Sequence, residues 1–169
     1  MQELQGRPLI QHVLDRLIPQ VDDVLINANQ NIARYKEFGC PVVPDRIGGF
    51  AGPLAGLDAG LHATEVPLVV TVPCDSPFLP HDLVARLEAA RSSIDAEVAV
   101  ARTGSQPHPV FALVCTRVRP HLVDFLARGE RKIDLWYASL NVIEVAFDDE
   151  ADAFANINTR AELAQHDRQ

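Results

Sequence analysis

A carboxylate that directly follows a strand-like run is the feature of this sequence best placed to do chemistry. Residues 68–72 are apolar and mostly β-branched without polar alternation, which predicts a strand buried on both faces, as in a parallel sheet. The run ends at Pro73, and Cys74, Asp75 and Ser76 follow. Ligands of open α/β sheets bind beyond the carboxyl ends of strands, so Asp75 is a candidate Mg²⁺ ligand. An Asp that caps a turn is the alternative interpretation.

A glycine-rich loop that leads into a predicted helix is the second such feature. Residues 45–56 carry Gly52 and Gly56 on either side of Pro53, and proline suits the first turn of a helix. Glycine lets the backbone approach a ligand closely. The first amides of a helix lack partners and lie at the positive end of its dipole, so this loop is a candidate anion site. A plain surface loop is the alternative.

Polar residues also follow two other short strand-like segments. Residues 24–26 lead into Asn27, and residues 41–43 are closely followed by Asp45. Because the carboxyl ends of parallel strands share one edge of a sheet, we expect Asn27, Asp45 and Asp75 to gather there with the glycine-rich loop. The sequence therefore predicts one composite site at the strand ends.

The elements that must position these residues alternate between helix and strand. Apolar spacing predicts helices over 8–17, 31–38, 53–63, 82–90, 119–126 and 133–140, and strands over 24–26, 41–43, 68–72, 96–101, 110–115 and 141–147. This alternation favours a doubly wound α/β fold with a mostly parallel sheet. The strands at 96–101 and 110–115 are joined by a short loop, which predicts an antiparallel excursion. Asp58 is expected to point away from the apolar face of its helix.

The composition is that of an ordinary globular protein and excludes several classes. The 169 residues are 47% hydrophobic and 22% charged, which predicts a single domain with a substantial core. A formal net charge of -8 argues against a broad nucleic-acid or anionic-membrane surface. Cys40, Cys74 and Cys115 form no CxxC pair, which favours reduced thiols and a cytoplasmic location. No apolar run approaches the ~20 residues of a membrane span, and nothing at the N-terminus suggests a signal peptide.

Other kinds of chemistry find little support in the residue pattern. No Ser-His-Asp order, HExxH motif or clustered Cys/His zinc set is apparent. His108 could act as a general base, but a histidine at the start of a buried strand is more often structural. Cys74 is interpreted as a small buried residue rather than a nucleophile, because nothing nearby in the sequence is clearly placed to lower its pKa.

Short motifs spread over nearly the whole chain resemble those of one enzyme family. They are the segments at 4–9, 26–29, 52–56, 73–78, 108–109, 129–131 and 154–159, which occur in family order. On these motifs the chain resembles the molybdenum cofactor guanylyltransferases, within the Mg²⁺-dependent nucleotidyltransferases of Rossmann-like fold. The resemblance implies transfer of GMP from MgGTP to the terminal phosphate of molybdopterin, with release of pyrophosphate.

The resemblance also implies roles for individual residues. Asn27 and Asp45 would bind the guanosine part of GTP, and Asp75 would bind Mg²⁺ and, through it, the phosphates. The residues that would lie along the nucleotide are Gly52, Pro53 and Gly56. The residues that would face the pterin are Arg131, Asn156 and Asn158. A solvated charge and turn-forming amides are the alternative for these last three.

The resemblance is incomplete at the start of the chain. Family members carry a buried strand and a glycine-rich loop with Arg and Lys, which cradles the triphosphate, before the segment that matches residues 2–9. We therefore expect one nucleotidyltransferase-like domain over 1–169, with the N-terminal strand and glycine-rich loop missing. The alternatives are a transferase that uses CTP or a sugar phosphate, and an inactive binding or assembly partner in cofactor synthesis. Expected partners are GTP and molybdopterin, together with cofactor-synthesis or target-enzyme proteins; nucleic acid and membranes are not expected.

Overall fold

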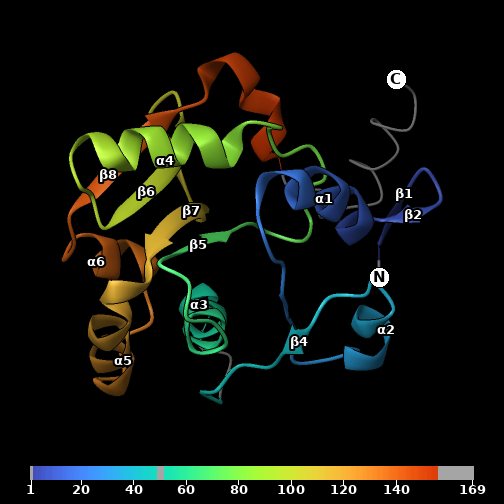
Figure 1. Ribbon diagram of the computed structural model, residues 1–169, viewed down its shortest axis with the longest axis horizontal. Helices are drawn as coiled ribbons and strands as arrows, with labels where there is room; N and C mark the ends of the chain where they lie inside the picture. Colours follow the sequence, from blue (N-terminus) through green and yellow to red (C-terminus); the bar gives the residue numbers. More distant parts are fainter. Residues whose placement is uncertain (1, 49–51, 156–169) are drawn as a thin grey trace.

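A four-stranded mixed sheet forms the centre of the molecule (Figure 1). The computed structural model describes residues 2–48 and 52–155. In order across the sheet, the strands are β5 (Leu68–Thr71), β7 (Gln106–Cys115), β6 (Val98–Thr103) and β8 (Val142–Ala146). β7 runs antiparallel to both of its neighbours, whereas β6 and β8 are parallel. The predicted antiparallel excursion is therefore confirmed.

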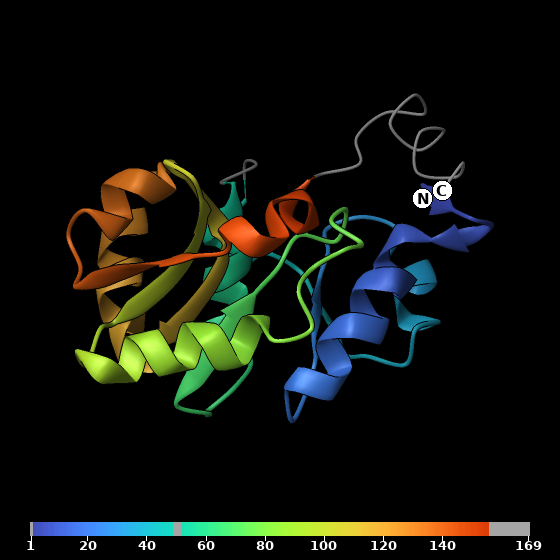
Figure 2. The same cartoon turned by 90° about the horizontal axis from the view of Figure 1, so that it is seen from above.

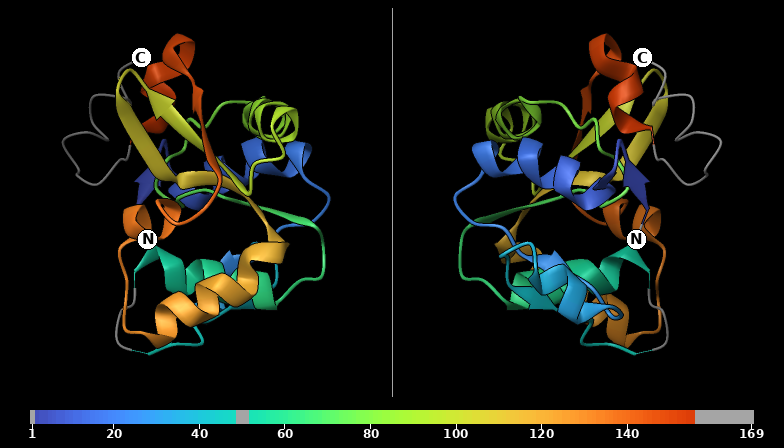
Figure 3. Two further views of the ribbon diagram at one scale, coloured as in Figure 1. Left: turned by 90° about the vertical axis from the view of Figure 1, so that its left-hand side faces the viewer. Right: turned by 90° about the vertical axis from the view of Figure 1, so that its right-hand side faces the viewer.

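Helices cover both faces of this sheet. The covering helices are α3 (Pro53–His62), α5 (Arg119–Ala127) and α6 (Ile133–Tyr137) on one face and α4 (Leu83–Ser93) on the other. Successive side chains of a strand point to opposite faces, so Val98 and Val100 of β6 join the first core and Ala99 and Ala101 join the second. Figure 3 shows α3 and α5 side by side, with α4 across the sheet from them. This arrangement confirms the doubly wound α/β fold.

A second unit, built from the N-terminal part of the chain, lies beside the four-stranded sheet (Figure 2). Its elements are β1 (Glu3–Leu4), β2 (Arg7–Pro8), α1 (Leu9–Leu17), η1 (Ile18–Gln20), β3 (Ile26–Asn27), α2 (Ile32–Lys36) and β4 (Val42–Val43). β3 and β4 pair in parallel, and β1 and β2 form an antiparallel hairpin that the sequence does not predict. α1 confirms its predicted apolar face, because its buried residues are Leu9, Ile10, Val13, Leu14 and Leu17.

β5 is less buried than its sequence predicts. All four residues of Leu68–Thr71 are partly exposed, and among the described residues β5 pairs only with β7. Among the described residues, β3 and β4 pair only with each other and form a sheet separate from the four-stranded one. Side chains of β5 do pack on both faces, Val69 on one core and Leu68 and Val70 on the other, but their burial is only partial. A strand with one hydrogen-bonded neighbour leaves an edge open, which accounts for this exposure.

The remaining differences lie at the ends of elements and in short 3₁₀ turns. α6 ends at Tyr137, earlier than predicted, and β7 begins at Gln106, earlier than predicted. The turns η2 (Thr116–Val118) and η3 (Asp148–Phe154) were not expected from the sequence. No helix within residues 2–48 and 52–155 combines the length and the apolar character needed to cross a membrane.

Candidate active site

Asn27, Asn29 and Asp45 form a hydrogen-bonded group at the carboxyl ends of β3 and β4, here called the amide–carboxylate cluster. The Asn27 Nδ2 donates to Asp45 Oδ1 at 2.9 Å and to the Val43 carbonyl at 3.1 Å. The Asn29 Nδ2 donates to Asp45 Oδ2 at 2.8 Å, and the Asp45 backbone N–H donates back to Asn29 Oδ1 at 2.8 Å. Each carboxylate oxygen of Asp45 thus receives one amide hydrogen bond. An ionised carboxylate can accept about four hydrogen bonds, so about two acceptor sites of Asp45 remain for a ligand.

Asn29 is the member of this cluster that the sequence analysis missed. The signal was present, because residues two apart in an extended segment point to the same side, and Asn27 and Asn29 have that spacing. The bonds themselves join positions that are 16 residues apart along the chain. Periodicity along one segment does not report such a contact.

The start of α3 lies against Asn27. Gly52 has a φ of +70°, a left-handed conformation that suits glycine, and Pro53 begins the helix. One turn later, a Cβ atom at Gly56 would lie 2.5 Å from the Asn27 Oδ1. Because Gly56 has no side chain, the Asn27 amide fits against the helix at this position. The structure brings the glycine-rich loop and the amide–carboxylate cluster together.

Side chains of the N-terminal unit hold the segment that carries Asp75. The Arg16 Nη1 donates to the Leu79 carbonyl at 3.1 Å, and the Gln20 Nε2 donates to the Pro80 carbonyl at 2.9 Å. The Asp75 side chain is partly exposed. In the part of the chain that the structure describes, no hydrogen bond or ion pair engages its carboxylate. None of the described residues therefore occupies its oxygens.

The Asp75 segment lies beside the unit that carries the amide–carboxylate cluster, because Arg16 and Gln20, which contact Leu79 and Pro80, belong to that unit. The pKa of Tyr35 on α2 in the same unit is raised, mainly by burial and to a smaller extent by the charge of Cys74.

Cys74 itself is exposed, so its prediction as a buried residue is wrong. It follows Pro73 beyond the end of β5, past Thr71, the last residue that pairs with β7. Although the residue presents surface to water, partial loss of water around the thiol raises its pKa, and the charge of Asp75 raises it further. The thiol is protonated at neutral pH, which agrees with the prediction that it is no nucleophile.

His108 is packed as a structural residue. Its Nε2 lies 2.8 Å from the Thr103 Oγ1, and its ring stacks on Phe154 with the centroids 4.8 Å apart. Burial lowers the pKa of His108, so its imidazole is neutral at neutral pH. These contacts favour the structural interpretation over the general base.

Arg131 is the one residue of the predicted pterin side within the described ranges. Its Nη1 donates to the carbonyls of Leu126 and Glu130, at 2.8 and 2.7 Å, and so satisfies the C-terminal end of α5. Asn156 and Asn158 lie outside the described residues. The contacts give Arg131 a structural role, and its role toward a substrate stays a prediction.

The carboxylate oxygens of Asp75 suit a hard divalent cation that the substrate would bind as well. Such cations prefer oxygen ligands, and the smaller ones take one or two protein carboxylates together with phosphate oxygens and water. Among the residues that the structure describes, no group of three or more His, Cys, Asp or Glu side chains could hold a metal ion. A cation at Asp75 would fit this pattern if phosphate oxygens and water supplied its remaining ligands.

Comparison with known proteins decides the family. Residues 1–141 match the family described as the MobA-like NTP transferase domain. A molybdenum cofactor guanylyltransferase from Ralstonia nicotianae is 48% identical over 174 residues, covering 98% of this chain and 85% of the relative. One from Cupriavidus taiwanensis is 49% identical over 172 residues, covering 99% and 86%. The chain belongs to the molybdenum cofactor guanylyltransferase family. It is therefore a nucleotidyltransferase, and the family predicted from its motifs is confirmed.

Solved structures agree on the fold. Molybdopterin-guanine dinucleotide biosynthesis protein A from Archaeoglobus fulgidus has a TM-score of 0.78 at 22% identity, over 99% of this chain and 87% of that one. The 2-C-methyl-D-erythritol 4-phosphate cytidylyltransferase from Thermus thermophilus has a TM-score of 0.71 at 18% identity, over 98% and 90%. At these identities the likeness concerns the fold alone. The Rossmann-like α/β architecture predicted for the chain is thereby confirmed.

Proposed function

We propose that this chain transfers GMP from MgGTP to the terminal phosphate of molybdopterin and releases pyrophosphate. The observation that carries the proposal is the amide–carboxylate cluster, in which two Asn amides orient Asp45 at the strand ends beside the start of α3. An oriented carboxylate accepts hydrogen bonds from the hydroxyl and N–H groups that a nucleoside presents. Membership of the guanylyltransferase family supports the same reaction.

The proposed reaction needs no nucleophile from the protein. An oxygen of the acceptor phosphate attacks the α-phosphorus of GTP and forms the new P–O bond. The bond from the α-phosphorus to its bridging oxygen breaks, and pyrophosphate leaves with that electron pair. The protein contributes alignment and charge neutralisation. The packing of His108 and the protonated Cys74 thiol fit this scheme, since neither is needed as base or nucleophile.

Individual roles follow from this reaction. Asn27 and Asp45 hold the guanosine part, and Asp75 would hold Mg²⁺, whose chemistry is to neutralise charge on the phosphates. The residues proposed to line the nucleotide are Gly52, Pro53 and Gly56. The residues proposed to face the pterin are Arg131, Asn156 and Asn158.

We also propose that one more strand completes a single nucleotidyltransferase domain between β3 and β5. β5 has an open edge with partly exposed apolar residues, and among the described residues β3 pairs only with β4. An extended segment paired with both would cover that edge and join the two sheets. The family resemblance puts such a strand, followed by the phosphate-binding loop, upstream of residue 2.

The proposal extends to the cellular location of the protein and to its partners. We infer a cytoplasmic protein with reduced cysteines, whose partners are GTP and molybdopterin. Proteins of cofactor synthesis, or the enzymes that receive the finished cofactor, are proposed to take over the product.

Calorimetric titration with MgGTP tests the proposal on the 169-residue chain and on the same chain extended upstream in its own reading frame. We expect the extended form to bind MgGTP and, given molybdopterin, to form the guanine dinucleotide and pyrophosphate. A preference for CTP would reject the guanine assignment. If neither form binds a nucleotide, the assignment of the amide–carboxylate cluster is wrong and a role as binding or assembly partner is favoured.

Replacing Asn29 by Ala should raise the KM for GTP about tenfold and leave kcat within about twofold, because the Asp45 carboxylate loses one of two orienting amides, worth about 1.5 kcal/mol. Steady-state rates at varied GTP concentration measure this split. Gln30 is exposed and adjacent in sequence, so Gln30→Ala is the matched control. An Asn29→Ala enzyme with unchanged KM would contradict the orienting role.

A further inference from the structure

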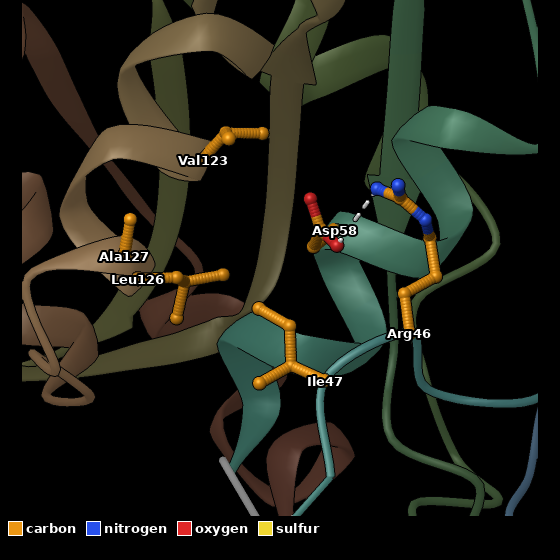
Figure 4. Close-up of a pocket in the computed structure, with 6 residues that line it drawn as sticks. All are labelled: Arg46, Ile47, Asp58, Val123, Leu126 and Ala127. Atoms are coloured by element: carbon orange, nitrogen blue, oxygen red, sulfur yellow. Dashed lines mark hydrogen bonds and ion pairs between the residues drawn. The ribbon is translucent and has the colours of Figure 1, made fainter.

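Asp58 and Arg46 form an ion pair beside the amide–carboxylate cluster. The Arg46 Nη1 lies 3.3 Å from Asp58 Oδ2, and Arg46 directly follows Asp45 in the chain (Figure 4). The Asp58 side chain is only 2% exposed, whereas the Arg46 side chain is 51% exposed. The prediction that Asp58 points away from the apolar face of α3 is therefore wrong, because its side chain is buried with the apolar residues of the helix. The ion pair joins a loop residue at the site to the interior side of the helix.

A cavity lies beneath this part of the loop. Its volume is about 340 Å³, and its lining residues are Arg46, Ile47, Asp58, Val123, Leu126 and Ala127. In Figure 4, Val123, Leu126 and Ala127 on α5 face Ile47 and Asp58 across this space. Ile47 is partly buried and packs against the core formed with α3 and α5. The preceding residue, Arg46, is exposed, and its ion pair with Asp58 ties it to α3.

The buried charge of Asp58 needs this partner. A buried carboxylate is costly unless a cation or hydrogen-bond donors compensate it. His62 lies nearby, with its Nδ1 3.1 Å from Asp58 Oδ1 and 2.9 Å from the Asp58 carbonyl. One Nδ1 proton cannot serve both oxygens fully, and Oδ1 is left without a well-aligned hydrogen bond among the described residues. Arg46 is always charged and is thus the main compensating group.

We propose that Asp58 is a positioning residue for the nucleotide loop. It holds Arg46 onto α3, while Asn27 and Asn29 hold Asp45, so each of the two consecutive loop residues is held by its own side-chain contacts. Asp45 then presents its free carboxylate positions in one orientation to the nucleoside. This inference rests on the proposed function, because it takes Asp45 to contact GTP. Loss of this positioning is expected to raise the dissociation constant for MgGTP and to leave kcat unchanged.

A double-mutant cycle tests the proposal, in whichever form of the protein binds MgGTP more tightly. The variants are Asp58→Asn, which keeps the shape and removes the charge, Arg46→Met, and the two together. Calorimetry gives the dissociation constant for MgGTP, and turnover with molybdopterin gives kcat separately. Glu88→Gln is the matched control, because it removes a carboxylate that pairs with Arg91 on α4, across the sheet from α3.

Each single variant is expected to weaken MgGTP binding about tenfold, and the double variant about tenfold as well, because both break the same contact. The control should bind as the unchanged protein does, and kcat should stay within about twofold. Arg46→Lys should recover part of the affinity, since it restores a positive charge without the planar fork.

Several results would overturn the inference. Normal affinity in Asp58→Asn would show that the loop needs no such anchor. A lack of MgGTP binding by the unchanged protein would overturn the proposed function and, with it, the inference that rests on it. Independent effects, which multiply to about a hundredfold, would show that Arg46 contacts the nucleotide itself. A fall in kcat and unfolding midpoint that parallels the affinity loss would assign Asp58 a purely structural role. If Asp58→Asn fails to fold, Arg46→Met at the exposed end gives the same readout. Dinucleotide formation by the unchanged protein is scored separately, so failure of the proposed function is distinguished from failure of the anchor.

Discussion

Replacing Asp75 by Asn is expected to lower turnover about a thousandfold while the fold stays intact. The amide has nearly the shape of the carboxylate but lacks the negative charge that a divalent cation requires. Asp75 is partly exposed, and no hydrogen bond or ion pair engages its carboxylate among the described residues. Its loss therefore leaves no partner unsatisfied, and the free energy of unfolding should change by less than about 0.5 kcal/mol. Turnover measured over a range of Mg²⁺ concentrations, beside a denaturant titration, checks both expectations.

Asp82→Asn is the matched control for this prediction. Asp82 is exposed at the start of α4, and its nearest ion pair, to Arg86, is 3.9 Å long. An exposed pair of that length contributes little, so the control should keep turnover within about twofold. Removal of the metal with a chelator should lower the turnover of the unchanged enzyme to that of Asp75→Asn. Full activity in Asp75→Asn would remove Asp75 from the metal site.

The sequence predicts well those elements whose own residues decide their structure. The spacing of apolar residues in α1 is enough to define its buried face, since one side of that helix packs on the protein. The same holds for β6 and β7, whose apolar runs flank a short turn. The positions of Asn27, Asp45 and Asp75 after strand-like segments could also be predicted, because the end of a strand is visible along the chain.

Features that depend on distant segments could not be predicted in this way. The apolar run of β5 shows that the strand suits burial, but it cannot show which neighbours pair with it. Asp58 reads as a polar position, yet α3 is buried around most of its circumference, and the compensating Arg46 comes from the loop before the helix. Asn29 meets Asp45 only through the pairing of β3 with β4. Each of these contacts is set by tertiary packing.

Gly56→Ala is expected to weaken GTP binding about 10- to 100-fold, because the new methyl group takes the place of the Asn27 amide. A Cβ atom at this position would lie 2.5 Å from the Asn27 Oδ1 and 3.1 Å from its Cγ. Both atoms belong to the end of a flexible side chain, so Asn27 can rotate away without moving the helix. It then loses its bonds to the Asp45 carboxylate and the Val43 carbonyl. The dissociation constant for MgGTP, measured by calorimetry, reports this loss.

The free energy of unfolding of Gly56→Ala should rise slightly or stay unchanged while its GTP affinity falls. This difference separates the effect from misfolding. Alanine stabilises a helix interior by about 0.5–1 kcal/mol relative to glycine, and this gain offsets the lost Asn27 bonds. Gly60→Ala is the matched control, because Gly60 lies on the same helix and a Cβ there meets nothing within 4 Å. The control should gain the helical stabilisation and keep its GTP affinity. If Gly56→Ala also keeps its affinity, the orientation of Asn27 does not matter for the nucleotide, and Asp45 must be held by Asn29 alone.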